Sequence, residues 1–177
     1  MYIVLPIDDF NLHNVFFSER QNNNVIHNCF FTHIYYSNDI FTLSNIVLHV
    51  DIPSASMDYM ESIIRNTTYN RYQSEVSVYK IRSCSWIKKM IQLEKDLLQL
   101  FRNSKETNNV RYNLKHTLEK GTLHVTGKPN STIVLRISGI WQDKMNNIGI
   151  IYKFIGSATS NHQTSVLSSD CNKTITL

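Results

Sequence analysis

The chain has 177 residues, of which 42% are hydrophobic and 18% charged, with 5 glycines and 3 prolines. This composition excludes collagen-like, low-complexity and fully disordered proteins, and the length suits one globular domain. No apolar run is long enough to span a membrane, and the first residues lack the basic start of a signal peptide. We therefore expect a soluble, intracellular protein with no membrane partner, and the 3 widely spaced cysteines predict no disulfide framework.

Charge is divided unevenly along the chain. Residues 1–64 contain one basic and seven acidic residues, whereas residues 65–177 contain 17 basic and seven acidic residues, so the two parts carry net charges of −6 and +10. This division is typical of a protein that offers a basic surface to a polyanion. It is as typical of a protein whose acidic part packs against its basic part.

The clearest predicted element is a long helix at residues 86–101, whose apolar residues recur at helical spacing. Alternating and β-branched segments predict strands at residues 2–7, 25–36, 40–52, 74–81, 122–126, 131–142 and 148–155. This order predicts the fold class α+β, as a mainly antiparallel β-sheet or an OB-like barrel with one long packed helix. Residues 1–156 should form this single domain, and residues 157–177 a polar C-terminal tail.

Two shorter helices are also predicted. Residues 112–120 form one of them, stopped by Gly121. Residues 57–65 form the other, because Asp58 and Glu61 have the spacing of a capping box. The segments 25–36 and 40–52, with turn residues between them, should pair as a hairpin.

Alternation along the strands predicts which side chains point away from the core. The outer face then collects Phe31, His33, Tyr35, His49, His124, Arg136 and Lys153. Aromatic rings interleaved with bases suit a single-stranded nucleic acid, because rings stack on bases and cations hold phosphates. The alternative is a sheet covered on both faces, in which Phe31 and Tyr35 are ordinary core residues.

Trp141 is a further candidate for stacking, and Lys88 and Lys89 on the long helix are candidate phosphate contacts. Strict alternation places Trp141 on the core side with Ile137. Only a β-bulge at Gly139, or the end of the strand, would turn the indole to the outer face.

Motifs for catalysis are missing from this sequence. It contains no glycine-rich phosphate loop, nucleophile elbow or zinc-protease motif. The pair Asp8 and Asp9 fits a solvated loop, and Glu94 with Asp96 fits the exposed side of a helix. We therefore expect a protein that is not an enzyme.

A metal site is considered and set aside. His27, Cys29 and His33 would share one strand face, but a metal ion needs ligands from a second element, and the sequence offers no partner cluster. Ordinary packing is the preferred interpretation, with no cofactor and no metal.

Three segments carry a resemblance to a known family, namely residues 35–46, residues 134–141 with the stretch Ile-Ser-Gly-Ile-Trp, and residues 149–155. They resemble a family of short proteins of nucleocytoplasmic large DNA viruses, some of which look like the OB-fold single-stranded DNA-binding proteins of tailed phages. The resemblance implies a role in viral DNA replication or recombination, in the host cytoplasm or at the viral replication site, with packaging in the virion as another location. The phage proteins end in an acidic tail, whereas here Asp170 is the one acid of residues 157–177.

Together these observations predict a non-enzymatic protein that binds single-stranded DNA without sequence preference. RNA as a second ligand and a homo-oligomeric state are left open. The rival hypothesis is a viral structural protein, such as a minor capsid or scaffold component, that binds other proteins. The net charge of residues 65–177 separates the two hypotheses, because the rival explains it only as docking to the acidic first third.

Overall fold

The computed structural model describes residues 4–23, 29–52, 57–66, 73–82, 85–104, 109–127 and 132–156. Its helices are α1 (Ser85–Ser104) and α2 (Asn113–Glu119), with short 3-10 turns at Ile7–Asp9 and Leu12–Asn14. Its strands are β1 (Leu5–Pro6), β2 (Val15–Phe17), β3 (Gln21–Asn22), β4 (Cys29–Ser37), β5 (Thr42–Leu43), β6 (Ile46–Asp51), β7 (Met57–Asn66), β8 (Gln73–Ile81), β9 (Thr122–Thr126), β10 (Thr132–Asp143) and β11 (Ile148–Gly156).

The strands form one open, mixed sheet in the order β1-β6-β10-β11-β9-β8-β7, with β2, β3 and β5 attached through β4. The pairs β1–β6 and β9–β11 are parallel, and the other pairs are antiparallel. The α+β class is therefore confirmed. The sheet does not close on itself, so the barrel form of the prediction stays unconfirmed.

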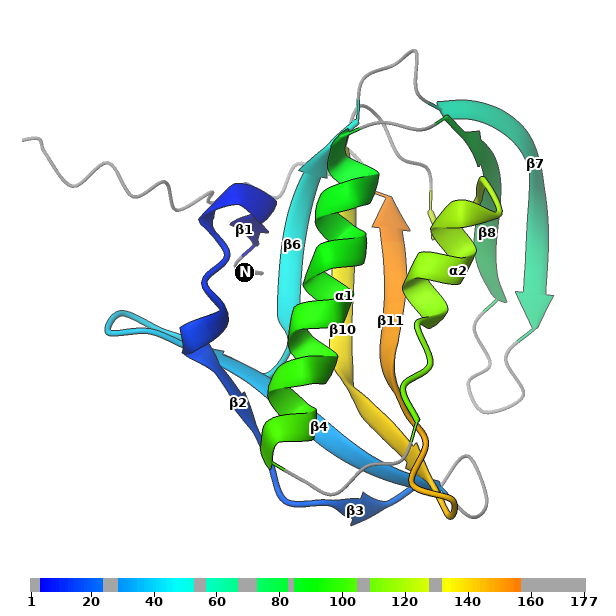
Figure 1. Ribbon diagram of the computed structural model, residues 1–177. Helices are drawn as coiled ribbons and strands as arrows, with labels where there is room; N and C mark the ends of the chain where they lie inside the picture. The colour runs from blue at the N-terminus through cyan, green and yellow to red at the C-terminus, as the bar shows by residue number, and fades with distance from the viewer. Residues whose placement is uncertain are drawn as a thin grey trace, which may run out of the picture.

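The longest strand, β10, joins two halves of the sheet. Its first half, residues 132–137, pairs with β6, and its second half, residues 139–143, pairs with β4. The register of β10 against β11 shifts between Ile137 and Gly139, so a β-bulge separates the two halves. Figure 1 shows β6 and β4 lying along these two parts of β10, with β11 on its other side.

Helix α1 lies across one face of the sheet and buries the predicted stripe (Figure 1). Met90, Leu97 and Phe101 are fully buried, and they pack in one cluster with Leu48 of β6 and Leu135 of β10. Burying a side chain of this size contributes roughly 1.5–3 kcal/mol each, so this stripe fixes the helix on the sheet. The predicted long helix is confirmed.

The short helix α2 is confirmed as well. It ends at Glu119, and Gly121 follows with a φ of 70°, in the left-handed region that glycine adopts without strain. Its first turn is held by a side chain of α1. The carboxylate of Glu94 accepts the backbone N–H groups of Leu114 at 2.8 Å and Lys115 at 2.7 Å. Glu94 is completely buried, so the prediction that it lies on the exposed side of the helix is wrong.

Burial raises the pKa of Glu94, and the hydrogen bonds from the backbone of Lys115, Leu114 and Asn113 oppose that rise. Water is excluded from the carboxyl group, which disfavours its charged form. Glu94 therefore couples the two helices through a group whose ionisation is costly in the folded protein.

Other predicted elements differ from the structure. Residues 57–65 form strand β7 and not a helix, because they pair along their length with β8. The segment 40–52 divides into β5, which makes a hairpin with β4, and β6, which pairs with β10, so the expected hairpin is only partly correct. The first strand is confined to β1, and β2 and β3 lie in a segment where no strand was expected.

The strands expected at 74–81, 122–126, 131–142 and 148–155 are confirmed as β8 to β11. The predicted tail, residues 157–177, lies outside the described residues. Across the ranges that the structure covers, no helix combines the length and the apolar character needed to cross a membrane.

Candidate nucleic-acid interface

The sheet has two unequal faces. Its inner face is packed under α1 and α2, and its outer face is turned away from both helices. Alternation along the last three strands is confirmed, since Leu123, Leu135 and Phe154 are buried in the core cluster while His124 and Lys153 are exposed. The outer face is the place where the sequence predicted a binding surface.

Three basic side chains lie on neighbouring strands of this outer face. Arg136 of β10 is the direct partner of Lys153 of β11. Lys153 and His124 of β9 each come one residue before the paired residues Phe154 and Val125. We call Arg136, Lys153 and His124 the basic row. The predicted grouping of these three residues agrees with the strand register.

The β-bulge in β10 decides the position of Trp141. Without it, Trp141 would share the inner face with Ile137, which is fully buried. The register shift between Ile137 and Gly139 reverses the alternation, so Ile140 is buried and Trp141 is partly exposed. Trp141 is then the direct partner of Phe31 on β4, and the two rings lie on the same face.

Aromatic side chains continue from Trp141 across β4 to β2. Phe31, His33 and Tyr35 alternate along β4, with ring centroids 4.4 Å apart between Phe31 and His33 and 6.5 Å apart between His33 and Tyr35. Tyr35 is the direct partner of Phe16 on β2. These five residues form what we call the aromatic band. Phe16 was missed by the sequence analysis, because its strand is only three residues long and is recognised through its pairing with β4.

The two ends of the band differ in exposure. The side chains of Phe16 and Tyr35 are 53% and 36% exposed, whereas Phe31, His33 and Trp141 are partly buried. At the buried end, the guanidinium of Arg111 lies 6.0 Å from the centroid of the Trp141 ring, within cation–π distance. Rings and a cation therefore lie together at this end of the band.

Two glycines let the rings at the buried end lie against the sheet. A Cβ on Gly149 would come within 2.7 Å of three atoms of the Trp141 indole, and a Cβ on Gly139 within 2.4 Å of the Phe31 ring. The space above each glycine is filled by the neighbouring ring, so both rings lie against the backbone at these glycines.

Replacing Gly149 by alanine should therefore destabilise the protein. The new methyl group overlaps the indole of Trp141, and overpacking of this kind costs about 1–3 kcal/mol. Urea denaturation of the variant should give a lower free energy of unfolding, and its tryptophan emission should shift because the ring is displaced. Unchanged stability and unchanged emission would show that the ring does not lie against Gly149.

The turn after Trp141 is fixed by Asp143. Its carboxylate accepts the backbone N–H groups of Met145 and Asn147 at 2.9 Å and the side-chain amide of Asn147 at 2.7 Å. These bonds, led by the side chain of Asn147, lower the pKa of Asp143 below its ordinary value of 3.8. The hairpin that carries Trp141 and Gly149 is therefore closed by a carboxylate that stays ionised at neutral pH.

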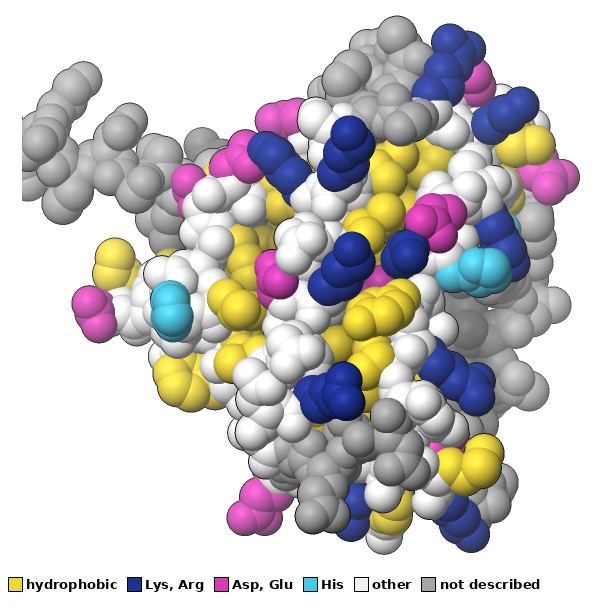
Figure 2. Space-filling view, in the orientation of Figure 1, with side chains coloured by type: hydrophobic (Ala, Val, Ile, Leu, Met, Phe, Trp, Pro, Cys, Tyr) yellow, Lys and Arg dark blue, Asp and Glu magenta, His cyan; other side chains and the backbone are white. Residues whose placement is uncertain are grey.

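Two predicted phosphate contacts lie elsewhere. Lys88 and Lys89 are on the exposed side of α1, which covers the inner face, so the outer face and these lysines are on opposite sides of the sheet. The Lys89 ammonium also pairs with the carboxylate of Asp8. Figure 2 views the protein from the α1 side and shows basic side chains spread over that helix, interrupted by acidic ones.

The remaining predicted contact, His49, shares the outer face with the basic row. It is the partner of Val134 on β10, and its Nε2 lies 3.9 Å from the carboxylate of Asp51. His49 therefore borders the row beside a carboxylate.

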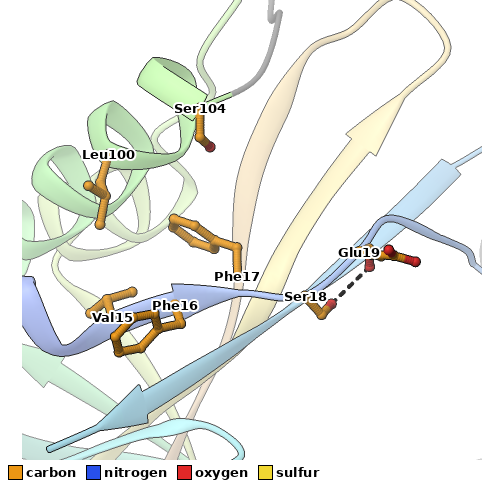
Figure 3. Close-up of a pocket in the computed structure, with 7 residues that line it drawn as sticks. All are labelled: Val15, Phe16, Phe17, Ser18, Glu19, Leu100 and Ser104. Carbon is orange, nitrogen blue, oxygen red and sulfur yellow. Dashed lines mark hydrogen bonds between the residues drawn. The ribbon is translucent and has the colours of Figure 1, made fainter.

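A second surface feature adjoins the band at β2. A cavity of about 400 Å³ is lined by β2 and by the end of α1. Figure 3 shows its lining residues, with Phe17 pointing toward the helix. The ring of Phe17 meets that of Phe101 edge to face at 5.1 Å. The cavity is lined mainly by apolar side chains, which anchor β2, and thereby Phe16, to the core.

The metal hypothesis gains no support. Cys29 carries a free thiol, His33 belongs to the aromatic band, and His27 lies outside the described residues. Within the part of the chain that the structure covers, no three potential ligands come together to hold an ion.

Comparison with known proteins does not identify the chain. No model of a protein family, no curated protein and no solved structure matches it. Function must therefore be inferred from the outer face itself.

Proposed function

We propose that this protein is a non-enzymatic single-stranded DNA-binding protein, which holds the strand on the outer face of its sheet without reading the sequence. The observation that carries the proposal is the β-bulge in β10, which aligns Trp141 with Phe31. Because of it, five aromatic residues and the basic row share one face. RNA is the second candidate ligand, since stacking on a ring does not distinguish the two.

The two parts of the face have different tasks in this proposal. Bases stack on the rings of the aromatic band, which accepts any base because every base has a flat face. Alternate side chains along a strand are about 6.8 Å apart, so the three rings of β4 offer successive bases a ladder of platforms. The basic row holds phosphates, and those contacts release counterions from the nucleic acid. A role in viral replication or recombination rests on the family resemblance alone.

Fluorescence anisotropy of a labelled oligo-dT of about 30 nucleotides tests this proposal, with titrations at several salt concentrations and a duplex of equal length as control. We expect binding to the single strand, a linear fall of log affinity with log salt, and weaker binding to the duplex. Absence of binding at low salt, or preference for the duplex, would contradict the proposal.

A second function is supported by a different observation. Two ion pairs, Asp8 with Lys89 and Asp58 with Arg82, join the acidic first third to the basic remainder, so part of the charge division is used within the fold. Partly buried Val47, Val134 and Ile155 also surround the basic row on the outer face. A structural protein that binds other proteins through this face would show no affinity for oligonucleotides, and its assembly would be insensitive to salt.

A further inference from the structure

The basic row differs from the other charged groups of the protein. The described ion pairs join other residues, and none of them connects Arg136, Lys153 or His124 to an acid. The Nε of Arg136 is buried and has no hydrogen-bond partner within the described ranges. A buried donor without a partner destabilises the folded protein, so a ligand that supplied an acceptor here would recover part of that cost.

A cavity opens beside the row. Strands β9 and β11 pair only where Val125 and Thr126 meet Phe154 and Ile155, and they separate before that point. A cavity of about 280 Å³ lies at this point, lined by residues of β9 and β11 together with Val76 of β8 and Thr117 of α2. Its lining includes Lys153 and His124 together with the hydroxyl-bearing residues Thr117, Thr126 and Tyr152.

We infer that the basic row and this cavity form a phosphate-binding subsite for a single strand that also stacks on the aromatic band. This inference rests on the proposed function. Phosphate suits the subsite because two cations and an imidazole stand side by side with the Thr126 hydroxyl nearby, and phosphate oxygens accept hydrogen bonds from all of them. Arg136 would bind the phosphate through its planar guanidinium, and Lys153 would bind it as a point charge.

The two parts of the site are separated along β10. Trp141 and Arg136 are five residues apart, which corresponds to about 15 Å of strand. A short oligonucleotide can therefore occupy the aromatic band without reaching the basic row, whereas a longer one engages both. We therefore expect the contribution of the basic row to the binding affinity to depend on the length of the bound strand.

The test compares Lys153→Gln with wild type on labelled oligo-dT of about four, eight and twelve nucleotides, at several salt concentrations. Lys153 is exposed, so its replacement should leave the fold intact. Lys95→Gln, on the exposed side of α1, removes the same charge on the opposite side of the sheet and serves as the matched control. A double variant, His124→Gln with Lys153→Gln, extends the test to a second exposed member of the row.

For the longest oligonucleotide, we expect Lys153→Gln to weaken binding several-fold and to reduce the steepness of the salt dependence by about 0.7, as one lost phosphate contact does on a single strand. For the shortest, affinity should equal that of wild type, and Lys95→Gln should match wild type at every length. Equal losses at all lengths, or no loss at any length, would overturn the subsite while leaving the proposed function standing. Failure of wild type to bind any oligonucleotide would instead overturn the proposed function, and the inference with it.

Discussion

Replacing Phe31 by leucine should weaken binding of single-stranded DNA by about 1–3 kcal/mol, the usual contribution of one ring that stacks on a base. Leucine keeps an apolar side chain over Gly139, so packing there is largely retained while the flat surface is lost. Trp141→Leu should act in the same way on the partner strand. Affinity is measured by anisotropy at fixed salt, and circular dichroism checks that each variant is folded.

The matched control for these variants is Tyr59→Leu. Tyr59 is 60% exposed on β7, at the far edge of the sheet from β4, and it belongs to neither the aromatic band nor the basic row. Its replacement should leave affinity unchanged. An equal loss in Tyr59→Leu and Phe31→Leu would mean that the losses do not come from stacking on the band.

The second large effect is expected at the contact between the helices. Glu94→Gln should lower the free energy of unfolding by about 1–3 kcal/mol. The single oxygen of glutamine replaces two oxygens that accept backbone N–H groups, and the NH₂ group of glutamine then faces one of those backbone donors. Urea denaturation measures the loss. Gln92→Ala, an exposed change two residues away on α1, is the control and should cost little. A Glu94→Gln protein as stable as wild type would show that α2 does not depend on this carboxylate.

The effect of Glu94→Gln should also depend on pH. Because burial raises the pKa of Glu94 above its ordinary value of 4.5, the folded protein holds that proton more tightly than the unfolded chain does. The stability that Glu94 contributes is then fully present below pH 4.5, declines as pH rises through the raised pKa, and is constant above it. The difference in unfolding free energy between wild type and Glu94→Gln should narrow over this range. A difference that widens as pH rises would mean that the pKa is lowered instead.

The local sequence pattern was sufficient to predict the helices and strands whose apolar residues recur at a regular spacing. The stripe of α1 and the alternation of β9, β10 and β11 each repeat over enough residues to specify one face. The residues of the basic row were found in this way, because regular alternation on neighbouring strands brings them together. Their grouping follows from the pleat of the strands and needs no knowledge of distant contacts.

Elements that depend on distant partners were not predicted. Asp58 and Glu61 suggested a helix start, but pairing with β8 provides backbone hydrogen bonds along the whole segment and outweighs that local signal. Strands β2 and β3 contain three and two residues, too few to show a period, and they exist because β4 pairs with them. Phe16 was missed for this reason.

The face on which Trp141 lies could not be predicted from the sequence, because it depends on the bulge in β10. Gly139 allowed two outcomes for Trp141, and the choice depends on pairing of the second half of β10 with β4. The burial of Glu94 was hidden similarly, since its partners are backbone groups 20 and 21 residues away in sequence. Lys88 and Lys89 were predicted to hold phosphates of the same strand as the outer-face residues, because a pattern does not reveal which face of a sheet a helix covers.

The measurement that tests the central claim most directly uses Trp141 as its own reporter. The protein has 2 tryptophans, and replacing the buried Trp86 by phenylalanine leaves Trp141 as the single source of tryptophan emission. The indole Nε1 of Trp86 is buried with no hydrogen-bond partner in the described part of the chain, so phenylalanine should be accepted there. Adding oligo-dT to Trp86→Phe should quench the emission in parallel with the rise in anisotropy, because a base stacks on the indole. Binding by anisotropy with unchanged emission would contradict the placement of the strand on the aromatic band.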